Sequence, residues 1–497
     1  MRISLFLTAA AIICSWTLPV DKPPQSEAVP APSIEAVLQS MRVDNALKHA
    51  SWGVCIRRLS DGAIVSLHDP DRRLMPASTI KLLTAAIALE TLGADYRFET
   101  LLQYSGQRDT STRTLNGDII IMGGGDPTLG SNQVEGSVGM SVLIDLWVSV
   151  LKAAGITRVN GSVVGDGSFF EDELPPSSWA WNDLGNYYAA AASGLTIADN
   201  TYKLTFTSPT GAGAATRITG TDPSMPEITF VNEVLTGAAG SHDEAYIHGS
   251  PLTYLRFIRG TIPPGRGSFT IKGSLPDPAL FAADQLRSAL IASGIEVVGE
   301  AKTHRDATFQ PDVRRMTLLR HASPRLIDIV TRVNEESDNL YAEHLLKMIG
   351  KTKKGRGTTL AGLQVIKEFI AAMGIDSNAF NIDDGSGLSR SNTISAGALS
   401  ASLVETSKLA SFKEFKQSLA VSGQSGTLKS VCNGTVAAGR IYGKSGSLKS
   451  VRCYAGYFTS LSGEEYAFAM LANYFSGSSQ AMKQKWEKLM VEMVKMK

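Results

Sequence analysis

The chain has 497 residues, of which 43% are hydrophobic and 19% charged, with a formal net charge of +1. A single hydrophobic core usually stops growing at about 250 to 300 residues, so we expect two or three domains. The near balance of charge leaves no surplus of Lys and Arg to neutralise phosphates, so nucleic acid is not an expected partner.

The N-terminus has the pattern of an export signal. One arginine precedes the apolar run ISLFLTAAAIICSWTLPV, and a Pro-rich stretch follows it. We predict a signal peptide over residues 1–20, a Pro-rich linker over 21–34, and export to the periplasm or cell envelope. A retained membrane anchor is the alternative, with association at the membrane surface. A lipid on Cys14 is disfavoured, because Ile13 stands where a small residue should precede a lipid-bearing cysteine.

The next elements are a hairpin and a helix. Residues 51–68 contain two β-rich runs around a Ser-Asp-Gly turn, which predicts a β-hairpin. Apolar residues then recur at helical spacing over residues 75–93, MPASTIKLLTAAIALETLG, and the predicted helix ends at Gly93. From about residue 94 to 310, short β-like runs are interrupted by Gly, Pro, Asp and Thr, which indicates one or two β-rich domains.

Helices return after about residue 315. We expect them within residues 323–350, 358–375 and 395–412, followed by two strand signals at 442–460 and 464–475 and a closing helix at 482–497. Strands and a helix come first, a β-rich middle second, and helices with strands last. This order predicts a middle region inserted into an α/β domain.

Cysteine usage predicts neither a disulfide framework nor a metal site. If the signal is removed, Cys55, Cys432 and Cys453 remain, so at least one thiol is unpaired within the chain. Cys432 and Cys453 could pair, since each follows a copy of a short repeat, SGTLKSV at residues 425–431 and SGSLKSV at residues 445–451. No CxxC or HExxH motif occurs, so we expect no structural zinc and no cofactor.

Ser78-Thr79-Ile80-Lys81 stands at the start of the first predicted helix. Three residues apart on a helix, a serine and a lysine share one face, so the amine can reach the hydroxyl. The residues that follow are apolar almost all round, so we expect the amine to be partly buried, which favours its neutral, basic form. Alone, the motif is weak, because a capping serine with a solvated lysine has the same spacing.

Two further motifs follow along the chain. Ser337-Asp338-Asn339 lies in a break between helical stretches, where each residue could simply cap a helix. Lys444-Ser445-Gly446-Ser447 enters a predicted strand. It belongs to the second copy of the repeated phrase SG[TS]LKSV, whereas Gln424 precedes the first copy. SxxK, SxN and Lys-[Ser/Thr]-Gly in this order form the signature of penicillin-recognising serine acyl-transferases.

The sequence lacks the motifs of two other protein classes, the phosphate-binding loop of nucleotide-binding proteins and the nucleophile elbow of Ser-His-Asp hydrolases. Gly439 and Gly443 stand one residue too close for a phosphate-binding loop ending at Lys444. Gly350-Lys351-Thr352 lacks the upstream glycine of that loop, and no Gly-Xaa-Ser-Xaa-Gly elbow is present.

The three motifs, together with GGGDPTL, GDGSFF, WAWNDLGNYYAAAASGLTIADN and DDGSGLSR, resemble the D-alanyl-D-alanine carboxypeptidase/endopeptidase family of the penicillin-binding protein 4 type, in the low-molecular-mass class C group. The resemblance extends from about residue 35 to 490. Ser337 follows Ser78 by about 260 residues, against about 60 in single-domain relatives.

The resemblance implies an α/β (α+β) serine β-lactamase/transpeptidase-like domain with two inserted β-rich domains. The transpeptidase-like domain would comprise residues 35–93 and 311–497. Inserted domain II would comprise 94–200 and 276–310, and inserted domain III would comprise 201–275.

The resemblance also implies the chemistry. Ser78 would be the nucleophile, Lys81 its general base, and Ser337 the relay that passes a proton to the leaving D-alanine amine. Like-charge repulsion from Lys444 would lower the pKa of Lys81. Water would then hydrolyse the acyl-enzyme and free the shortened stem peptide, so that the whole reaction gives D-alanine or a cleaved cross-link.

Substrate-binding roles follow from the same resemblance. Asn339 would hold the peptide stem, while Lys444 and Ser445 would hold the terminal carboxylate or its β-lactam mimic. The backbone N–H groups of Ser78 and Ser447 would form the oxyanion hole. Asp166 would bind the free amine of the stem peptide's diamino acid, or else is only a turn carboxylate.

The expected partners are therefore peptidoglycan stem peptides and β-lactam antibiotics, with no metal ion and no nucleic acid. A serine β-lactamase is one alternative function, and a catalytically silent cell-wall-binding protein is another. The sequence leaves open the balance of carboxypeptidase and endopeptidase activity, the composition of the stem peptide and the oligomeric state. Asp338 is expected to serve local structure rather than chemistry.

Overall fold

A computed structural model describes residues 32–171, 174–311 and 313–497. The predicted signal peptide and most of the Pro-rich linker lie outside these residues. The last linker positions, 32–34, begin helix α1 (Pro32–Arg42). None of the helices within the described ranges has both the length and the apolar character needed to span a membrane.

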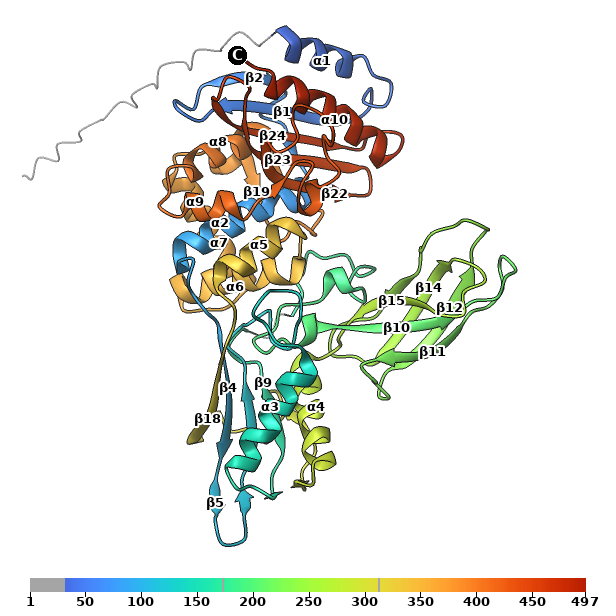
Figure 1. The fold of residues 1–497 in the computed structure, drawn as a ribbon, viewed down its shortest axis with the longest axis vertical. Helices are drawn as coiled ribbons and strands as arrows, with labels where there is room; N and C mark the ends of the chain where they lie inside the picture. The colour runs from blue at the N-terminus through green and yellow to red at the C-terminus, as the bar shows by residue number, and fades with distance from the viewer. Residues whose placement is uncertain (1–31, 172–173, 312) are drawn as a thin grey trace, which may run out of the picture.

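The upper part of the molecule, which we call the body, is built around one antiparallel sheet of six strands in the order β2-β1-β24-β23-β22-β21 (Figure 1). The strands are β1 (Ser51–Arg58), β2 (Ile64–His68), β21 (Ala420–Val421), β22 (Ile441–Leu448), β23 (Val451–Thr459) and β24 (Glu465–Asn473). Because β1 pairs with β24, the two ends of the described chain close the same sheet.

Helices cover both faces of this sheet. Helix α1 and helix α10 (Ser479–Val494) pack on one face. The other face carries α2 (Lys81–Leu92), α5 (Leu326–Glu335), α6 (Asn339–Lys354), α7 (Thr359–Ala372), α8 (Ala396–Thr406) and α9 (Phe412–Gln417). A small sheet of β3 (Arg73–Leu74), β19 (Phe380–Asn381) and β20 (Thr393–Ser395) lies at its edge.

Most of the predicted body elements are confirmed, with one exception. The hairpin at 51–68 forms as β1 and β2, and the helix that follows ends at Gly93 with φ 86°. The run at 442–460 was expected to be one strand, but it folds as β22 and β23, which pair with each other. Ser450, at the turn between them, has φ 56°, and Val451 faces the core immediately after it.

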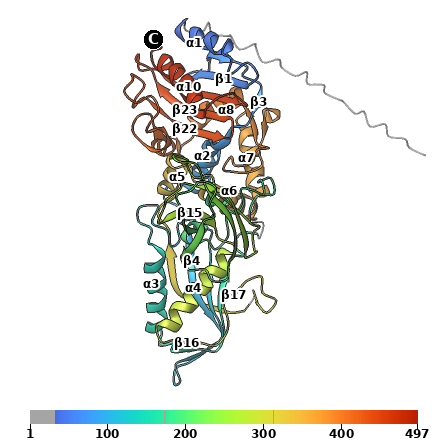
Figure 2. The same cartoon turned by 90° about the vertical axis from the view of Figure 1, so that its right-hand side faces the viewer.

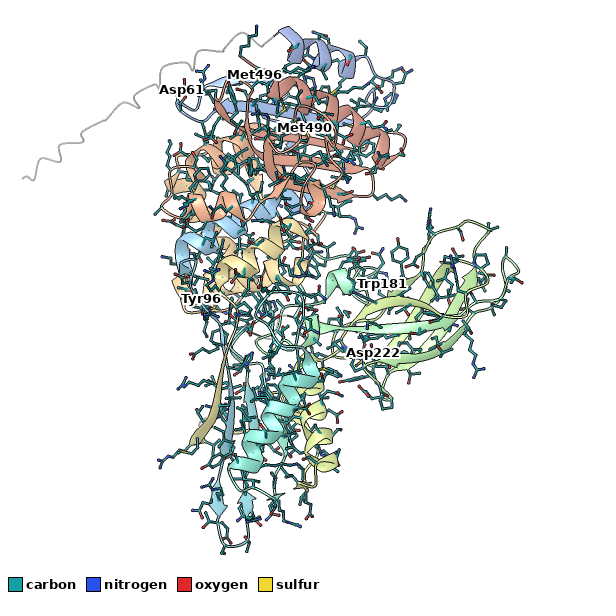
Figure 3. All side chains as sticks on the ribbon, in the orientation of Figure 1. Asp61, Tyr96, Trp181, Asp222, Met490 and Met496 are labelled. Carbon is teal, nitrogen blue, oxygen red and sulfur yellow. The ribbon has the colours of Figure 1, made fainter. Side chains whose placement is uncertain are left out.

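The chain leaves the body after α2 and returns before α5, and these two crossings lie side by side. Strand β4 (Glu99–Ser105) pairs antiparallel with β18 (Arg315–Ala322). Tyr96, labelled in Figure 3, precedes β4 at this junction; its carbonyl accepts a hydrogen bond from Leu326 N and its ring packs edge-on against Phe98. The middle of the chain is thus inserted between two parts of the body.

The inserted region first forms an elongated stem below the body (Figures 1 and 2). One sheet has the order β17-β9-β7-β4-β18 and another β16-β8-β6-β5. Their further strands are β5 (Gln107–Asp109), β6 (Thr114–Asn116), β7 (Ile119–Met122), β8 (Arg158–Val159), β9 (Val163–Asp166), β16 (Glu296–Val297) and β17 (Lys302–Thr303). Two helices that the β-like texture of the sequence did not predict, α3 (Met140–Ala153) and α4 (Pro278–Ala292), pack beside these sheets.

An arm projects sideways from the top of the stem (Figure 1). It consists of two three-stranded sheets, β11-β10-β15 and β12-β14-β13. Their bounds are β10 (Thr201–Thr207), β11 (Arg217–Asp222), β12 (Thr229–Thr236), β13 (Tyr246–His248), β14 (Leu255–Ile262) and β15 (Phe269–Ser274). Stem and arm share one continuous apolar core. The predicted fold class is confirmed, whereas the residue limits set for domains II and III stay predictions.

The possible disulfide between Cys432 and Cys453 does not form, since both thiols are free and buried. Cys453 on β23 packs in the core beneath α2 and α6, whereas Cys432 packs against Met490 of α10 on the opposite face of the sheet. The sheet itself separates the two sulfur atoms.

Candidate active site

Ser78 lies in a short 3₁₀ turn, η1 (Ala77–Ile80), which leads directly into α2. Ala77 has φ 46°, in the left-handed region that few non-glycine residues adopt. The Pro76 carbonyl accepts from both the backbone N–H and the hydroxyl of Thr79, at 3.2 and 2.8 Å. These contacts fix the turn and leave Ser78 half-buried, between the fully buried Ala77 and Thr79.

Lys81, the first residue of α2, is completely buried. Its Nζ donates hydrogen bonds to Ser78 Oγ at 3.0 Å, to Asn339 Oδ1 at 2.6 Å and to the Ser386 carbonyl at 2.5 Å. The helical spacing therefore brings the amine to the serine hydroxyl, as the sequence predicted. All three acceptors are neutral oxygen atoms, so the amine has good hydrogen bonds without a carboxylate in direct contact.

Burial lowers the pKa of Lys81 to about 8, and the more distant carboxylates of Asp384, Glu343 and Asp338 oppose this shift. A buried ammonium loses its hydration, which favours the neutral amine. From the sequence, two causes were expected, burial of the amine and repulsion from Lys444. In the structure, burial is the main cause, and repulsion from Lys81 instead contributes to lowering the pKa of Lys444.

The SxN motif forms the start of α6. Asp338 is the N-cap and accepts a hydrogen bond from Tyr341 N, which matches the local structural role expected for it. Asn339 follows, and its Nδ2 donates to the Tyr188 carbonyl at 2.7 Å while its Oδ1 accepts from Lys81. The amide is therefore held at both ends, between Lys81 and the inserted region.

Ser337 is half-buried with φ 64°, and it lines a cavity of about 270 Å³ together with Asn339 and Tyr188. Among the described residues, no hydrogen bond joins its side chain to Lys81 or Lys444, whose Nζ atoms donate elsewhere. The structure thus places Ser337 beside Asn339, and its relay role stays a prediction.

The third motif lies on β22, which packs against η1. A Cβ on Gly446 would lie 2.5 Å from the Pro76 carbonyl and 3.0 Å from Ser78 N, so only glycine permits this approach of β22 to Ser78. Lys444 is fully buried, and its Nζ donates to the Ser445 carbonyl at 2.8 Å. Burial, with repulsion from Lys81 and Arg452, holds the pKa of Lys444 well below its usual value.

Beyond Gly443 the outer edge of β22 is open. Strand β21 pairs only with Tyr442 and Gly443, so within the described residues no strand bonds to positions 444–448 on that side. Ser445 is nearly buried and Ser447 is exposed. An unpaired strand edge can accept an extended peptide as an additional strand.

Three groups behind Lys81 were missed by the sequence analysis, although it noted the segment DDGSGLSR. The Ser386 carbonyl contacts Lys81, and the buried carboxylates of Asp384 and Glu343 hold the backbone around it. A backbone carbonyl carries no signature in a sequence. Glu343, by contrast, stands four residues after Asn339, one helical turn away on the same face, and that spacing could have indicated it.

Asp166 is not brought together with Ser78 and Lys81. It ends β9 in the stem, where its 2% exposed side chain forms an ion pair with Arg315 at 2.7 Å and accepts from the Ser168 hydroxyl at 2.6 Å. Burial alone would raise the pKa of this carboxyl, but Ser168 and Arg315 outweigh it and hold the pKa below its usual value. The carboxylate is already satisfied by protein groups.

A second carboxylate lies nearer the site. Asp183 accepts from the Tyr188 hydroxyl at 3.0 Å and pairs with Arg390 at 3.1 Å, while the backbone carbonyl of Tyr188 accepts from Asn339. Tyr188 and Leu448, the last residue of β22, pack on the same small apolar cluster. Asp183 is therefore linked to Asn339 through Tyr188.

No group of three or more His, Cys, Asp or Glu side chains that could hold a metal ion occurs within residues 32–171, 174–311 and 313–497.

Comparison with known proteins places this arrangement in a family. The model of the D-Ala-D-Ala carboxypeptidase 3 (S13) family matches residues 34–496. A D-alanyl-D-alanine carboxypeptidase from an Actinomadura species is 30% identical over 455 residues, which cover 89% of this chain and 81% of that protein. D-alanyl-D-alanine carboxypeptidase DacB of Haemophilus influenzae is 25% identical over 431 residues, 85% of each chain.

The fold matches as well. The crystal structure of penicillin-binding protein 4 from Haemophilus influenzae superposes with a TM-score of 0.77 at 22% identity, covering 93% of this chain and 98% of that one. A second crystal structure of that protein, complexed with a β-lactam, gives a TM-score of 0.74 at 21% identity, with 94% and 100% coverage. The resemblance recognised in the sequence is confirmed: the chain belongs to the D-Ala-D-Ala carboxypeptidase 3 (S13) family and is a serine-type carboxypeptidase.

Proposed function

We propose that the chain is an exported enzyme that trims or cleaves peptidoglycan stem peptides through an acyl-enzyme on Ser78. The observation that carries the proposal is the contact of 3.0 Å between Lys81 Nζ and Ser78 Oγ, with burial lowering the pKa of the amine to about 8. A serine hydroxyl is a poor nucleophile until a nearby base takes its proton, and a neutral lysine can do so. The proton would then reach the leaving D-alanine amine through Ser337.

Substrate binding follows from the open edge of β22. An extended peptide can pair with residues 444–448, with its terminal carboxylate held by Lys444 and Ser445 and its stem held by Asn339. The close approach of Gly446 to Ser78 N supports an oxyanion hole formed by the N–H groups of Ser78 and Ser447. Each such donor contributes about 3 to 4 kcal/mol to the transition state in other serine enzymes.

β-Lactam antibiotics are expected to acylate the same serine. Penicillin-binding protein 4 of Haemophilus influenzae, whose fold this chain shares, has been crystallised with a β-lactam. Because the β-lactam carboxylate occupies the position of the substrate carboxylate, Lys444 and Ser445 serve both ligands. Export to the periplasm or cell envelope would bring the enzyme to peptidoglycan, its proposed substrate.

For the amine of the diamino acid there are two candidate carboxylates, one in the stem and one linked to the site through Tyr188. Asp166 can reach a ligand only if its ion pair with Arg315 opens, since its side chain is 2% exposed. Asp183 lies beside Tyr188, whose carbonyl contacts Asn339, the residue proposed to hold the peptide stem. We therefore add Asp183 to Asp166 as a candidate for this role.

The test is labelling with a fluorescent penicillin. The wild-type protein should give a covalent band that persists for many minutes, and Ser78→Ala should give none while keeping the circular dichroism of the wild type. Ser149→Ala, an exposed serine on α3, is the matched control and should label normally.

Two outcomes would overturn the assignment. A folded wild-type protein that takes no label would leave the silent cell-wall-binding protein as the better description. Rapid release of the label, with turnover of penicillin, would instead make the chain a β-lactamase. Release of D-alanine from a stem pentapeptide, absent in Ser78→Ala, would complete the assignment.

A further inference from the structure

Two buried carboxylates stand behind Lys81 and belong to none of the three motifs. Glu343 on α6 is 1% exposed, and Asp384 in the loop after β19 is fully buried. Neither carboxylate touches the lysine. Both bind the short segment from Gly385 to Gly387, which lies between them and α2.

The segment connects the carboxylates to Lys81 through single peptide groups. The Ser386 carbonyl accepts from Lys81 Nζ at 2.5 Å, and the N–H of the same peptide group, on Gly387, donates to Asp384 Oδ1 at 2.7 Å. The preceding peptide group repeats this arrangement. Its carbonyl, on Gly385, accepts from Thr84 Oγ1 at 2.8 Å, and its N–H, on Ser386, donates to Glu343 Oε1 at 2.8 Å.

Glu343 is therefore placed to hold the backbone that leads into the Ser386 carbonyl, while Asp384 holds the N–H of that carbonyl's own peptide group. The Oε1 of Glu343 also accepts from Gly385 N at 3.0 Å, so one oxygen holds two consecutive N–H groups. Asn339 and Glu343 lie one turn apart on α6, on the same face. One helix thus supplies Lys81 with an acceptor directly, through Asn339, and fixes a second acceptor through Glu343.

Asp384 has a broader structural task. Its two oxygens accept from Gly387 N, Asn392 Nδ2, Ser389 N and the indole of Trp179. An asparagine at this position could not accept all four bonds, because its NH₂ group is a donor. Glu343, in contrast, binds only the two N–H groups next to the acceptor of Lys81 and can be altered more selectively.

We propose that Glu343 is a positioning residue for acylation, which holds the Ser386 carbonyl against Lys81 and sets how readily that lysine gives up its proton. The inference rests on the proposed function, since it concerns the base that activates Ser78. Glu343 touches no reacting atom. It acts through the Gly385–Ser386 backbone.

The charges around the pair give the direction of the effect. Lys81 faces Glu343 from α6, Asp384 from the loop, Asp338 at the start of α6, and Lys444 from β22. Burial and Asp384 raise the pKa of Glu343 to about 8, so its ionisation falls in the range where Lys81 also titrates. An ionised Glu343 favours the protonated lysine, whereas a neutral side chain of the same shape keeps the hydrogen bonds without doing so.

Two substitutions separate the effect of the charge of Glu343 from the effect of its side-chain length. Glu343→Gln keeps a carbonyl oxygen for both N–H groups and removes the charge; Glu343→Asp keeps the charge and shortens the side chain by one methylene. The second-order rate of acylation by a fluorescent penicillin is measured from about pH 6 to about pH 9. Glu368→Gln, in an exposed ion pair with Lys354, is the control and should leave the profile unchanged.

We expect Glu343→Gln to move the midpoint of the acid limb, near pH 8 where Glu343 itself ionises, to lower pH by up to about one unit, with a plateau within a few-fold of the wild type. Without the anion, Lys81 loses its proton more easily, so the active form appears at lower pH. Glu343→Asp should instead lower the plateau about tenfold or more, because the Ser386 carbonyl is no longer held in place, and should leave the limb where it is.

An unchanged limb in Glu343→Gln would overturn the inference, as would a Glu343→Asp enzyme with the rate of the wild type. A Glu343→Gln chain that fails to fold would also contradict it, since the hydrogen bonds are held to survive that exchange. If the wild-type protein takes no label at all, the failure lies in the proposed function instead.

Discussion

The active site and the stem each bury a charged side chain, and they satisfy it in opposite ways. In the active site, Lys81 meets three neutral oxygens and no carboxylate within hydrogen-bonding distance. In the stem, Asp166 meets the guanidinium of Arg315 at 2.7 Å. The lysine has a pKa lowered to about 8, and the aspartate also has a lowered pKa, but the consequences differ.

For a base, a lowered pKa favours the uncharged form, which is the form that can accept a proton. For an acid, it favours the charged form, which stabilises the ion pair. The active site therefore holds a group that titrates near the working pH, and the stem holds one that remains ionised. The difference indicates that hydrogen bonding alone does not determine whether a buried charge serves chemistry or structure; the charge of its partner does.

Removing the amine should have the largest effect. Lys81→Ala is expected to reduce penicillin acylation about 10³-fold or more, because the base is lost while Ser78 remains. The variant should remain folded with an unfolding temperature close to that of the wild type, since the substitution also removes a buried charge that has no counterion. Stopped-flow acylation and circular dichroism measure the two quantities. Lys354→Ala, at the exposed end of α6, should change neither.

In the stem, breaking the ion pair should affect stability and spare acylation. Asp166→Asn leaves Arg315, only 13% exposed, without its counterion, which should cost about 3 kcal/mol of unfolding free energy. Hydrogen exchange at the β9 amides measures the loss. Asp95→Asn, in an exposed pair with Arg325, should cost less than about 1 kcal/mol.

The same variant tests the predicted role of Asp166 in substrate binding. If this carboxylate contacts the stem-peptide amine, Asp166→Asn should slow turnover of a peptide with a free amine more than that of an amine-blocked peptide. Equal slowing of both would exclude the contact. Asp183→Asn, assayed in parallel, decides between the two carboxylates.

The pH dependence should sharpen the comparison further. If Lys81 is the base, it acts when neutral, so acylation should fall about tenfold per unit below a pKa of about 8 and level off above it. Stability should follow the same titration. Between about pH 8 and the usual lysine pKa of 10.5 the unfolded chain binds more protons than the folded one, so the free energy of unfolding should rise with pH. A flat rate profile would remove Lys81 from the role of base.

Much of the body could be predicted from the sequence, because its elements have clear periodicity. The hairpin at 51–68 and the helix ending at Gly93 are local patterns with turn residues at their ends. The stem was predicted less completely. Its helices α3 and α4 lie among short strands rich in Gly and Pro, and that texture dominated the prediction.

The site was predicted as far as its groups stand in short motifs. Ser78 and Lys81 meet because helical spacing brings them together. Glu343 and Asp384 could not be identified in the same way, since they act on a backbone carbonyl that only the folded chain brings to Lys81. Asp166 and Asp183 both stand in segments that resemble the family, and only the tertiary structure shows that Asp166 pairs with Arg315 in the stem while Asp183 binds Tyr188, whose carbonyl contacts Asn339.

The repeated phrase shows how far local sequence decides structure. The first copy forms the 3₁₀ turn η5 (Gly426–Leu428), with Gly426 at φ 50°, where a Cβ would lie 2.7 Å from the backbone of Glu335. The second copy forms β22, the turn and the start of β23. Similar residues thus adopt different backbones, because β23 pairs along the whole of the second copy's strand.

The smallest effect is expected at Asp338, which both stabilises a helix and acts on the charge of Lys81. It caps α6 by accepting from Tyr341 N, pairs with Arg332 at 3.2 Å, and is the least of the three carboxylates that raise the pKa of Lys81. Asp338→Ala should therefore cost about 1 kcal/mol of stability through the lost cap.

It should also move the acid limb of acylation to lower pH by less than Glu343→Gln does, because its charge acts on Lys81 more weakly. Ser478→Ala removes the equivalent cap of α10, far along the chain from the motifs, and should lower the unfolding free energy by a similar amount while leaving the limb in place. If both variants gave the same acylation profile as the wild type, Asp338 would be a cap alone. A larger shift in Asp338→Ala than in Glu343→Gln would mean that Asp338 acts on Lys81 more strongly than Glu343 does, contrary to the order expected here.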